Sequence, residues 1–263
     1  MEQYCHIEIE SCFSLAKKAE GQIIAEALRH GYCEQTIFAL RLSLEEALTN
    51  AIRHGNKKQT QKKVCVDYKV TNTQIDIKIS DEGVGFTPGA VPDPTSETQL
   101  STPSGRGVLL MQAYMDEVTF NDKGNEVHLV KRNSDPDALK YHTITSFGKL
   151  NVKVSGDKQQ TTVILSGSAE MVEAQELDVL LDKTTQEGHC HLIIDLSGLL
   201  FTCSIGLGAL IKAQTHCQKQ AGQLVLVAPQ PPVQRVLETT RLDRLFNIAQ
   251  TLSEATSQFK ISN

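Results

Sequence analysis

The sequence predicts two α/β domains joined by a linker. The chain has 263 residues, a length that suggests two domains. Strand and helix patterns alternate along most of it, which favours helices layered on sheets. The segment 133–147 lacks a clear hydrophobic period and contains Asp135-Pro136. The order of predicted helices and strands differs on either side of it. We therefore predict domains over 1–132 and 148–263, with the linker between them.

Composition and charge exclude several classes of protein. The hydrophobic fraction of 40% and the charged fraction of 22% are ordinary for globular domains. The net charge is −5 and neither half has a basic excess, so we expect no nucleic-acid ligand. No apolar run approaches the ~20 residues of a membrane span and no leader segment is recognisable, so we expect a cytoplasmic protein without membrane contact.

The seven cysteines form no CxxC pair, which fits a reducing compartment better than a disulfide framework. One group could be a metal site: His189-Cys190-His191, with His216 and Cys217 further along. On a strand, however, His189 and His191 would share one face and Cys190 would point away. The paired motifs typical of zinc sites are also missing. We expect these side chains to serve packing.

Apolar periodicity predicts the elements of the first domain in order. Helices are expected at 11–30, before Gly31, and at 34–54, before Gly55-Asn56. Two strands follow because every second residue is apolar, over 64–70 and 75–79. Residues 82–104 are rich in Gly, Pro, Ser and Thr and form a long loop, which inside a domain is usually functional. A helix near 105–116 and strands near 117–121 and 125–131 complete the domain.

The second domain alternates strand and helix. Strands are expected near 150–154, 160–166, 191–196, 224–227 and 245–248, and helices near 170–186, 205–221 and 233–240.

The first candidate site lies in the second predicted helix. Glu46 and Asn50 are four residues apart and therefore share a face, with His54 one turn further. A carboxylate and a carboxamide placed in this way could act as a base and as a ligand of Mg²⁺, which prefers oxygen. The alternative is a polar stripe that is simply solvated.

Two glycine-rich segments follow in order. Asp81 precedes Gly83 and Gly85 directly after a strand, where the backbone could approach a ligand closely, although a tight turn is the simpler interpretation. Gly105, Arg106 and Gly107 open a helix, whose free N–H groups suit phosphates. A glycine-rich turn alone would be non-specific.

Taken together, these motifs resemble the Bergerat-type ATP-binding domain, an α/β sandwich shared by gyrases, heat-shock chaperones, histidine kinases and mismatch-repair ATPases. More narrowly, residues 1–132 resemble the anti-sigma-factor serine kinases of bacterial partner switches. The matching phrases are EEALTNAIRHGN, DEGVGF, SGRGVLLMQAYMDEV and GNEVHLVKR. No GxxxxGK[ST] phosphate loop or protein-kinase HRD or DFG element competes with this resemblance. A histidine kinase would need a dimerisation helix pair with a phosphoacceptor histidine before this domain, so that alternative requires a partner protein to supply one.

The resemblance implies ATP and Mg²⁺ as cofactors and gives a role to each matching residue. Asn50 would hold Mg²⁺, and Glu46 would orient or deprotonate the attacking hydroxyl. Asp81 would accept a hydrogen bond from the adenine amino group, beside Gly83 and Gly85. The loop 87–104 would act as a lid, with Gly105, Arg106 and Gly107 closing on the phosphates.

Residues 149–256 resemble the STAS domain of anti-sigma-factor antagonists, the usual substrates of such kinases. The matching phrases are HLIIDLSGLLFTCSIGLGALIKA and GQLVLVAPQPPVQRVLETTRLDRLF. That family carries Asp-Ser-(Ser/Thr)-Gly at the start of a helix and is phosphorylated on the first serine. Here Ser204 keeps that position, but Cys203 and Ile205 replace its neighbours. Ser204 is therefore either a phosphoacceptor or a plain helix N-cap.

These expectations combine into an ATP-dependent serine/threonine kinase that regulates a sigma factor or a similar target. The fused STAS module would be a substrate, a regulator or a dimerisation unit, meeting the kinase in cis or in trans, and a homodimer is expected. The alternative function is a non-catalytic binding protein whose ATP or ADP state selects its partners.

Overall fold

The computed structural model describes residues 4–87, 93–102, 105–133, 149–156 and 160–260. It forms two compact units, one of residues 1–92 with 107–145 and one of residues 93–106 with 146–263. Apart from Asn133, the predicted linker lies outside the described residues. Within the described part of the chain, no helix is both long and apolar enough to cross a membrane.

The first unit contains an antiparallel sheet in the order β1-β2-β3-β5-β4. Its strands are β1 (Cys5–Glu10), β2 (Lys63–Val70), β3 (Gln74–Asp81), β4 (Glu117–Phe120) and β5 (Glu126–Arg132). Every second residue of β2 and β3 is buried, including Val64, Val66, Ile75 and Ile77. One face of the sheet therefore meets the core, as the alternation in the sequence predicts.

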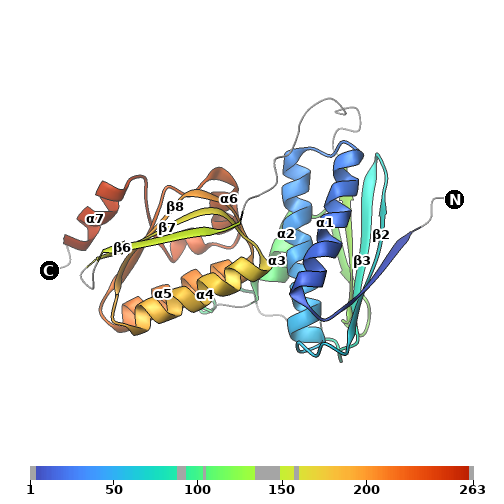
Figure 1. The fold of residues 1–263 in the computed structure, drawn as a ribbon, viewed down its shortest axis with the longest axis horizontal. Helices are drawn as coiled ribbons and strands as arrows, with labels where there is room; N and C mark the ends of the chain where they lie inside the picture. The colour runs from blue at the N-terminus through green and yellow to red at the C-terminus, as the bar shows by residue number, and fades with distance from the viewer. Residues whose placement is uncertain (1–3, 88–92, 103–104, 134–148, 157–159, 261–263) are drawn as a thin grey trace. The chain divides into compact units, whose positions relative to one another are not determined.

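Helices supply the other layer of this unit. They are α1 (Phe13–Arg29), α2 (Glu34–Asn50) and α3 (Arg106–Tyr114), and α1 and α2 run side by side along the sheet (Figure 1). Residues Ala51–Gly55 continue α2 as a π-helix. Ile23, Leu40, Leu44 and Leu48 are fully buried, so the apolar faces that predicted these helices form the core.

The second unit contains a mixed sheet in the order β10-β9-β8-β7-β6. Its strands are β6 (Asn151–Gly156), β7 (Thr161–Ala169), β8 (His191–Thr202), β9 (Gln223–Val227) and β10 (Asn247–Ala249). Only β6 and β7 pair antiparallel; the other neighbours are parallel. The helices are α4 (Met171–Gln186), α5 (Ser204–Lys219), α6 (Pro231–Thr239) and α7 (Leu252–Lys260), with a 3₁₀ turn at Leu242–Arg244.

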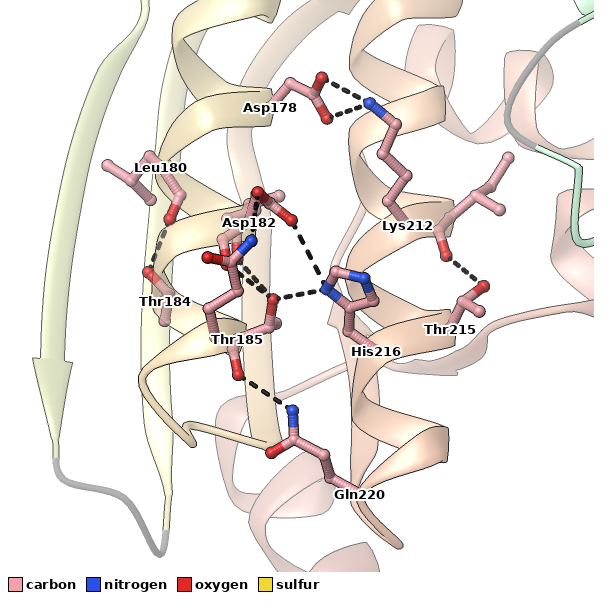
Figure 2. Close-up of polar contacts among 12 residues, drawn as sticks. Asp178, Leu180, Asp182, Thr184, Thr185, Lys212, Thr215, His216 and Gln220 are labelled. Atoms are coloured by element: carbon pink, nitrogen blue, oxygen red, sulfur yellow. Dashed lines mark hydrogen bonds and ion pairs between the residues drawn. The ribbon is translucent and has the colours of Figure 1, made fainter.

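Helices α4 and α5 lie side by side and share polar contacts (Figure 2). Lys212 pairs with Asp178 at 2.6 Å. Nδ1 of His216 lies 3.1 Å from the hydroxyl of Thr185, and Gln220 donates to the Thr185 carbonyl at 3.1 Å. These contacts tie the C-terminal halves of the two helices together and account for His216 without a metal.

Three elements depart from the sequence prediction. Strand β1 and helix α7 were not predicted, and β8 continues to Thr202 instead of ending at 196. The extension of β8 pairs with β7 through two register shifts, one between Ile164 and Ser166 and one between Gly167 and Ser168. Such irregular pairing breaks the two-residue period by which a strand is recognised.

Candidate functional site

Glu46, Asn50 and Gly107 come together where α2 ends and α3 begins. A Cβ atom added to Gly107 would lie 2.6 Å from Oε2 of Glu46 and 3.6 Å from Nδ2 of Asn50. The spacing of four on α2 therefore places both side chains against the same point of the chain, as predicted. Only a glycine allows this approach without displacing the carboxylate of Glu46.

Glu46 is buried, with 1% of its surface exposed. The alternative of a solvated polar stripe is therefore wrong at this position. The preceding Glu45 and Glu20 of α1 are buried as well. Lys17 pairs with both, at 3.5 Å and 3.2 Å, and Arg41 pairs with Glu20 at 3.3 Å. The Lys17–Glu45 and Arg41–Glu20 pairs link α1 to α2 in the turns before the site.

His54 lies in the π-helix that follows α2. The N–H of Asn56 bonds the carbonyl of Ala51 at 2.8 Å, a five-residue spacing that widens the helix. His54 is exposed while Glu46 is buried. That His54 shares a face with Glu46 and Asn50 stays a prediction.

Asp81, at the end of β3, lies against two glycines. Its Oδ1 accepts a hydrogen bond from the N–H of Gly83 at 2.7 Å. A Cβ atom on Gly55 would lie 2.2 Å from the Asp81 carboxyl carbon, and one on Gly83 would lie 2.6 Å from Oδ1. Burial raises the pKa of Asp81, against the Gly83 hydrogen bond and the charges of Lys123 and Lys62. The chain thus holds a partly desolvated carboxylate between two backbone segments.

One continuous helical segment links the two groups of residues. Glu46 and Asn50 lie on α2, and Gly55 ends the π-helix that follows it and contacts Asp81. Glu46, the candidate base, and Asn50, the candidate metal ligand, therefore lie on the same helical segment as Gly55, which contacts the Asp81 carboxylate.

Two asparagines support the site and were missed from the sequence. Asn56 is fully buried; its Oδ1 accepts from the Glu82 N–H at 3.0 Å, and its Nδ2 donates to Ser11 and to the Lys63 carbonyl, both at 2.7 Å. Asn125 donates from Nδ2 to the Asp81 carbonyl at 2.7 Å. The signal for Asn56 in the sequence is its place in the Gly-Asn pair after the predicted helix, and such a pair is typical of a helix end.

Gly85 occupies a turn that needs glycine. Its φ is +78°, and an added Cβ would lie 1.8 Å from the carbonyl oxygen of Lys123. Gly124, with φ of +70°, approaches Phe86 just as closely. The turn after β3 and the turn between β4 and β5 therefore touch through their backbones. Both glycines are needed for this contact, in addition to any role beside a ligand.

Gly105 directly precedes α3, and Arg106 is the first residue of that helix. Gly105 has a φ of +95°, and Pro94 is the one described residue within 4 Å of its Cβ position. Arg106 is 1% exposed; its guanidinium donates to the carbonyls of Thr102 and Leu100, and burial lowers its pKa. In this structure Arg106 thus holds the loop before α3. Residues 88–92 and 103–104 of the predicted lid, with Ser104, lie outside the described residues.

In the second unit Ser204 is the first residue of α5. The N-cap is Cys203, which is extended (φ −95°, ψ 177°) and makes no capping hydrogen bond through its side chain. The interpretation of Ser204 as the N-cap is therefore wrong by one residue. A Cβ atom on Gly206 would lie 2.3 Å from the hydroxyl of Thr202, which keeps the first turn of α5 close to the end of β8.

The histidines and cysteines considered as a metal site do not converge. Among the described residues, the only group of convergent metal-ligating side chains lies elsewhere, in the first unit. The ring of His189 bonds the hydroxyl of Thr161, and that of His191 packs on Phe259. Cys217 is buried, which raises its pKa to about 12. The packing role predicted for them fits these contacts.

Comparison with known proteins finds one family in each half of the chain. Residues 18–131 match the histidine kinase-like ATPase domain, and residues 151–255 match the STAS domain. A serine-protein kinase RsbW from Bacillus subtilis (strain 168) is 30% identical over 118 residues, which cover 40% of this chain and 70% of that protein. The anti-sigma F factor of Bacillus velezensis is 31% identical over 106 residues, which cover 38% of this chain and 72% of that protein.

A solved structure is similar to part of the chain. An anti-sigma factor antagonist from Mycobacterium paratuberculosis is 28% identical, with a TM-score of 0.39, and the likeness covers 42% of this chain and 94% of that one. The two domain matches and the two sheets agree with both resemblances that the sequence predicted: an ATPase-type domain with an antiparallel sheet, then a STAS domain with a mixed sheet.

Proposed function

The chain belongs to the histidine kinase-like ATPase family that includes the RsbW serine-protein kinases and the anti-sigma F factors, and we propose that it is an ATP-dependent serine/threonine protein kinase. It would act in the cytoplasm, in a bacterial partner switch that controls a sigma factor or a similar regulator. The observation that carries the proposal is the meeting of Glu46, Asn50 and Gly107 at the start of α3.

The residues of the first unit fit ATP and Mg²⁺. Glycine at positions 55 and 83 lets the Asp81 carboxylate lie against both backbone segments, because a Cβ atom at either position would overlap it. That carboxylate would accept a hydrogen bond from the adenine amino group. Asn50 offers an amide oxygen, a ligand type that Mg²⁺ uses, next to the N-terminal end of a helix suited to phosphates. Mg²⁺ would neutralise phosphate charge when bound.

Glu46 would act on the acceptor hydroxyl. A buried carboxylate one turn before Asn50 would orient that hydroxyl and take its proton. Phosphoryl transfer depends mostly on positioning and on charge neutralisation, so one base and a phosphate cradle suffice chemically. Gly105, Arg106 and Gly107 would contact the phosphates, which requires Arg106 to exchange its bonds with the Thr102 and Leu100 carbonyls for bonds to the nucleotide.

The STAS domain would serve as substrate or regulator. Ser204 opens α5, where the helix N-terminus would favour a phosphate and the added charge would alter binding of a partner. Partners would be the regulated factor and a STAS-domain antagonist, in cis or in trans, with a second copy of the chain forming a homodimer.

Labelled ATP tests the proposal. The full chain is incubated with γ-labelled ATP and Mg²⁺, alone and with STAS-domain proteins encoded near it, and compared with Glu46→Gln and Ser204→Ala. We expect transfer to a protein by the wild type and a loss of about 100- to 10,000-fold in rate with Glu46→Gln, which keeps the shape of the side chain but removes the base. Loss of self-labelling in Ser204→Ala alone would identify Ser204 as an acceptor.

The alternative function has a distinct outcome in the same assay. Tight ATP binding with no transfer to any of these proteins, by the wild type or the variants, would indicate a nucleotide-gated binding protein. The replacement of both neighbours of Ser204 relative to the antagonist pattern is the observation that favours this alternative.

A further inference from the structure

A group of metal-ligating side chains lies outside the nucleotide site, on β1 and β2. His6, Glu8 and Cys65 each offer one ligand atom, and these atoms all lie within 4.8 Å of one another. Their side chains are exposed or half-buried, so an ion from solution can reach them. A nitrogen, an oxygen and a sulfur ligand that converge in this way match the ligand types of zinc.

The pairing of the two strands explains why these side chains meet. In the antiparallel ladder, Glu8 lies opposite Cys65 and His6 lies opposite Asp67. Residues two apart share a face of the sheet, so the four side chains form a block on one face. The neighbours Ile9, Val64 and Val66 are buried on the other face. The regular sheet therefore fixes the positions of all four Cα atoms before any ion binds.

Asp67 orients the histidine. Its Oδ1 lies 2.7 Å from Nδ1 of His6, which leaves Nε2 of the ring as the nitrogen for a metal. A carboxylate that holds the second nitrogen of a metal-binding histidine is the usual outer partner of zinc sites. This pair is an observation independent of the convergence of His6, Glu8 and Cys65.

We propose that His6, Glu8 and Cys65 bind one zinc ion at the edge of the ATPase sheet, with Asp67 orienting His6. The fourth position would be taken by water, because these three residues supply the protein ligands. Binding releases the thiol proton of Cys65 to solvent and changes no oxidation state. Because the ligands come from both strands, the ion would pin β1, an edge strand, to β2.

Metal titration of the full chain tests the proposal. The reduced, metal-free protein, without nucleotide, is titrated with Zn²⁺ by competition with a chromophoric chelator, and with Co²⁺ by absorption spectroscopy. We expect one high-affinity ion per chain and a thiolate-to-cobalt charge-transfer band. Cys65→Ser should abolish the band, and His6→Ala should weaken zinc binding at least about tenfold. Asp67→Asn should weaken it about 10- to 100-fold, as is usual when an outer partner is lost.

Cys33→Ser is the matched control, because Cys33 is an exposed cysteine remote from this group in sequence and outside it. It should keep both the affinity and the band. Circular dichroism and the melting temperature of the metal-free variants check that each is folded; added zinc should raise the melting temperature of the wild type and of Cys33→Ser but not of Cys65→Ser. Absence of tight zinc binding, or equal binding and the same band in folded Cys65→Ser, would overturn the proposal.

Discussion

At the scale of one residue, burial of the Asp81 carboxylate lowers the folding stability of the protein when the group is ionised. Its folded pKa is raised by burial, so its ionised form is the less stable one in the folded protein. The contribution to stability is thus fully present below the ordinary pKa of 3.8 and is lost as pH rises through the raised value. At neutral pH the folded protein carries this cost, as binding sites often do.

Asp81→Asn should therefore separate binding from folding. Asparagine keeps the acceptor for the Gly83 N–H but has no charge to desolvate. We expect the free energy of unfolding at pH 7 to be unchanged or higher, by denaturant titration. ATP affinity should fall about 10- to 100-fold, since a hydrogen bond to a charged group contributes about 1.5–3 kcal/mol. A variant that unfolds more easily by over about 1 kcal/mol but binds ATP normally would contradict this role.

Gly85 gives a second prediction at this scale. Because its φ is +78° and an added Cβ would lie 1.8 Å from the Lys123 carbonyl, Gly85→Ala should lower the free energy of unfolding by more than about 1 kcal/mol. Denaturant titration measures this directly. An unchanged midpoint would show that the turn can relax.

The sequence predicted part of the site residue by residue. Glu46 and Asn50 follow from a spacing that any helix converts into proximity, and the structure brings them together. The contacts of Asp81 with Gly55 and Asn125 join segments far apart in the chain, and the distance between such segments cannot be obtained from periodicity. The inward place of Arg106 against loop carbonyls likewise depends on tertiary packing.

At the scale of elements, α2 and its π-helical end carry most of the proposed nucleotide site. The start of α3 must approach them closely, and Gly107 permits it. Gly107→Ala should slow phosphoryl transfer by displacing Glu46, while the free energy of unfolding changes little. The matched control is Gly21→Ala in α1, where an added Cβ meets nothing within 4 Å.

Gly21→Ala should stabilise the protein by about 0.5–1 kcal/mol, because alanine is the better helix former, and leave transfer unchanged. Thermal unfolding and the labelled-ATP assay measure both variants. Equal transfer rates in the two would show that Glu46 does not need its present position.

Elements were predicted well where a core enforces a regular period and poorly elsewhere. The long helices and β2 and β3 follow the expected ranges within a few residues. Strand β1 has only Ile9 buried, and α7 only Ala255, so neither shows a strong apolar pattern. The π-helix leaves no mark on periodicity because Ala51 and Ile52 continue the apolar face.

At the scale of the whole molecule, fusion of a kinase-type domain to a STAS domain suggests regulation within one chain. Joining the two domains in one chain would raise the effective concentration of each for the other. We expect the separated domains, 1–132 and 148–263, to bind each other with an affinity that depends on ATP or ADP. Calorimetry on the two halves measures it; no binding with either nucleotide would mean that the STAS domain acts on other proteins.

The central claim is that the first unit binds Mg²⁺-ATP through Asn50 and Asp81. Isothermal titration calorimetry of the full chain with a non-hydrolysable ATP analogue tests it, with Mg²⁺ and with excess chelator. The account predicts one site per chain, weaker binding without Mg²⁺, and little further effect of the chelator in Asn50→Ala. No binding by the wild type, or the same affinity and Mg²⁺ dependence in Asn50→Ala and Asp81→Asn, would contradict it.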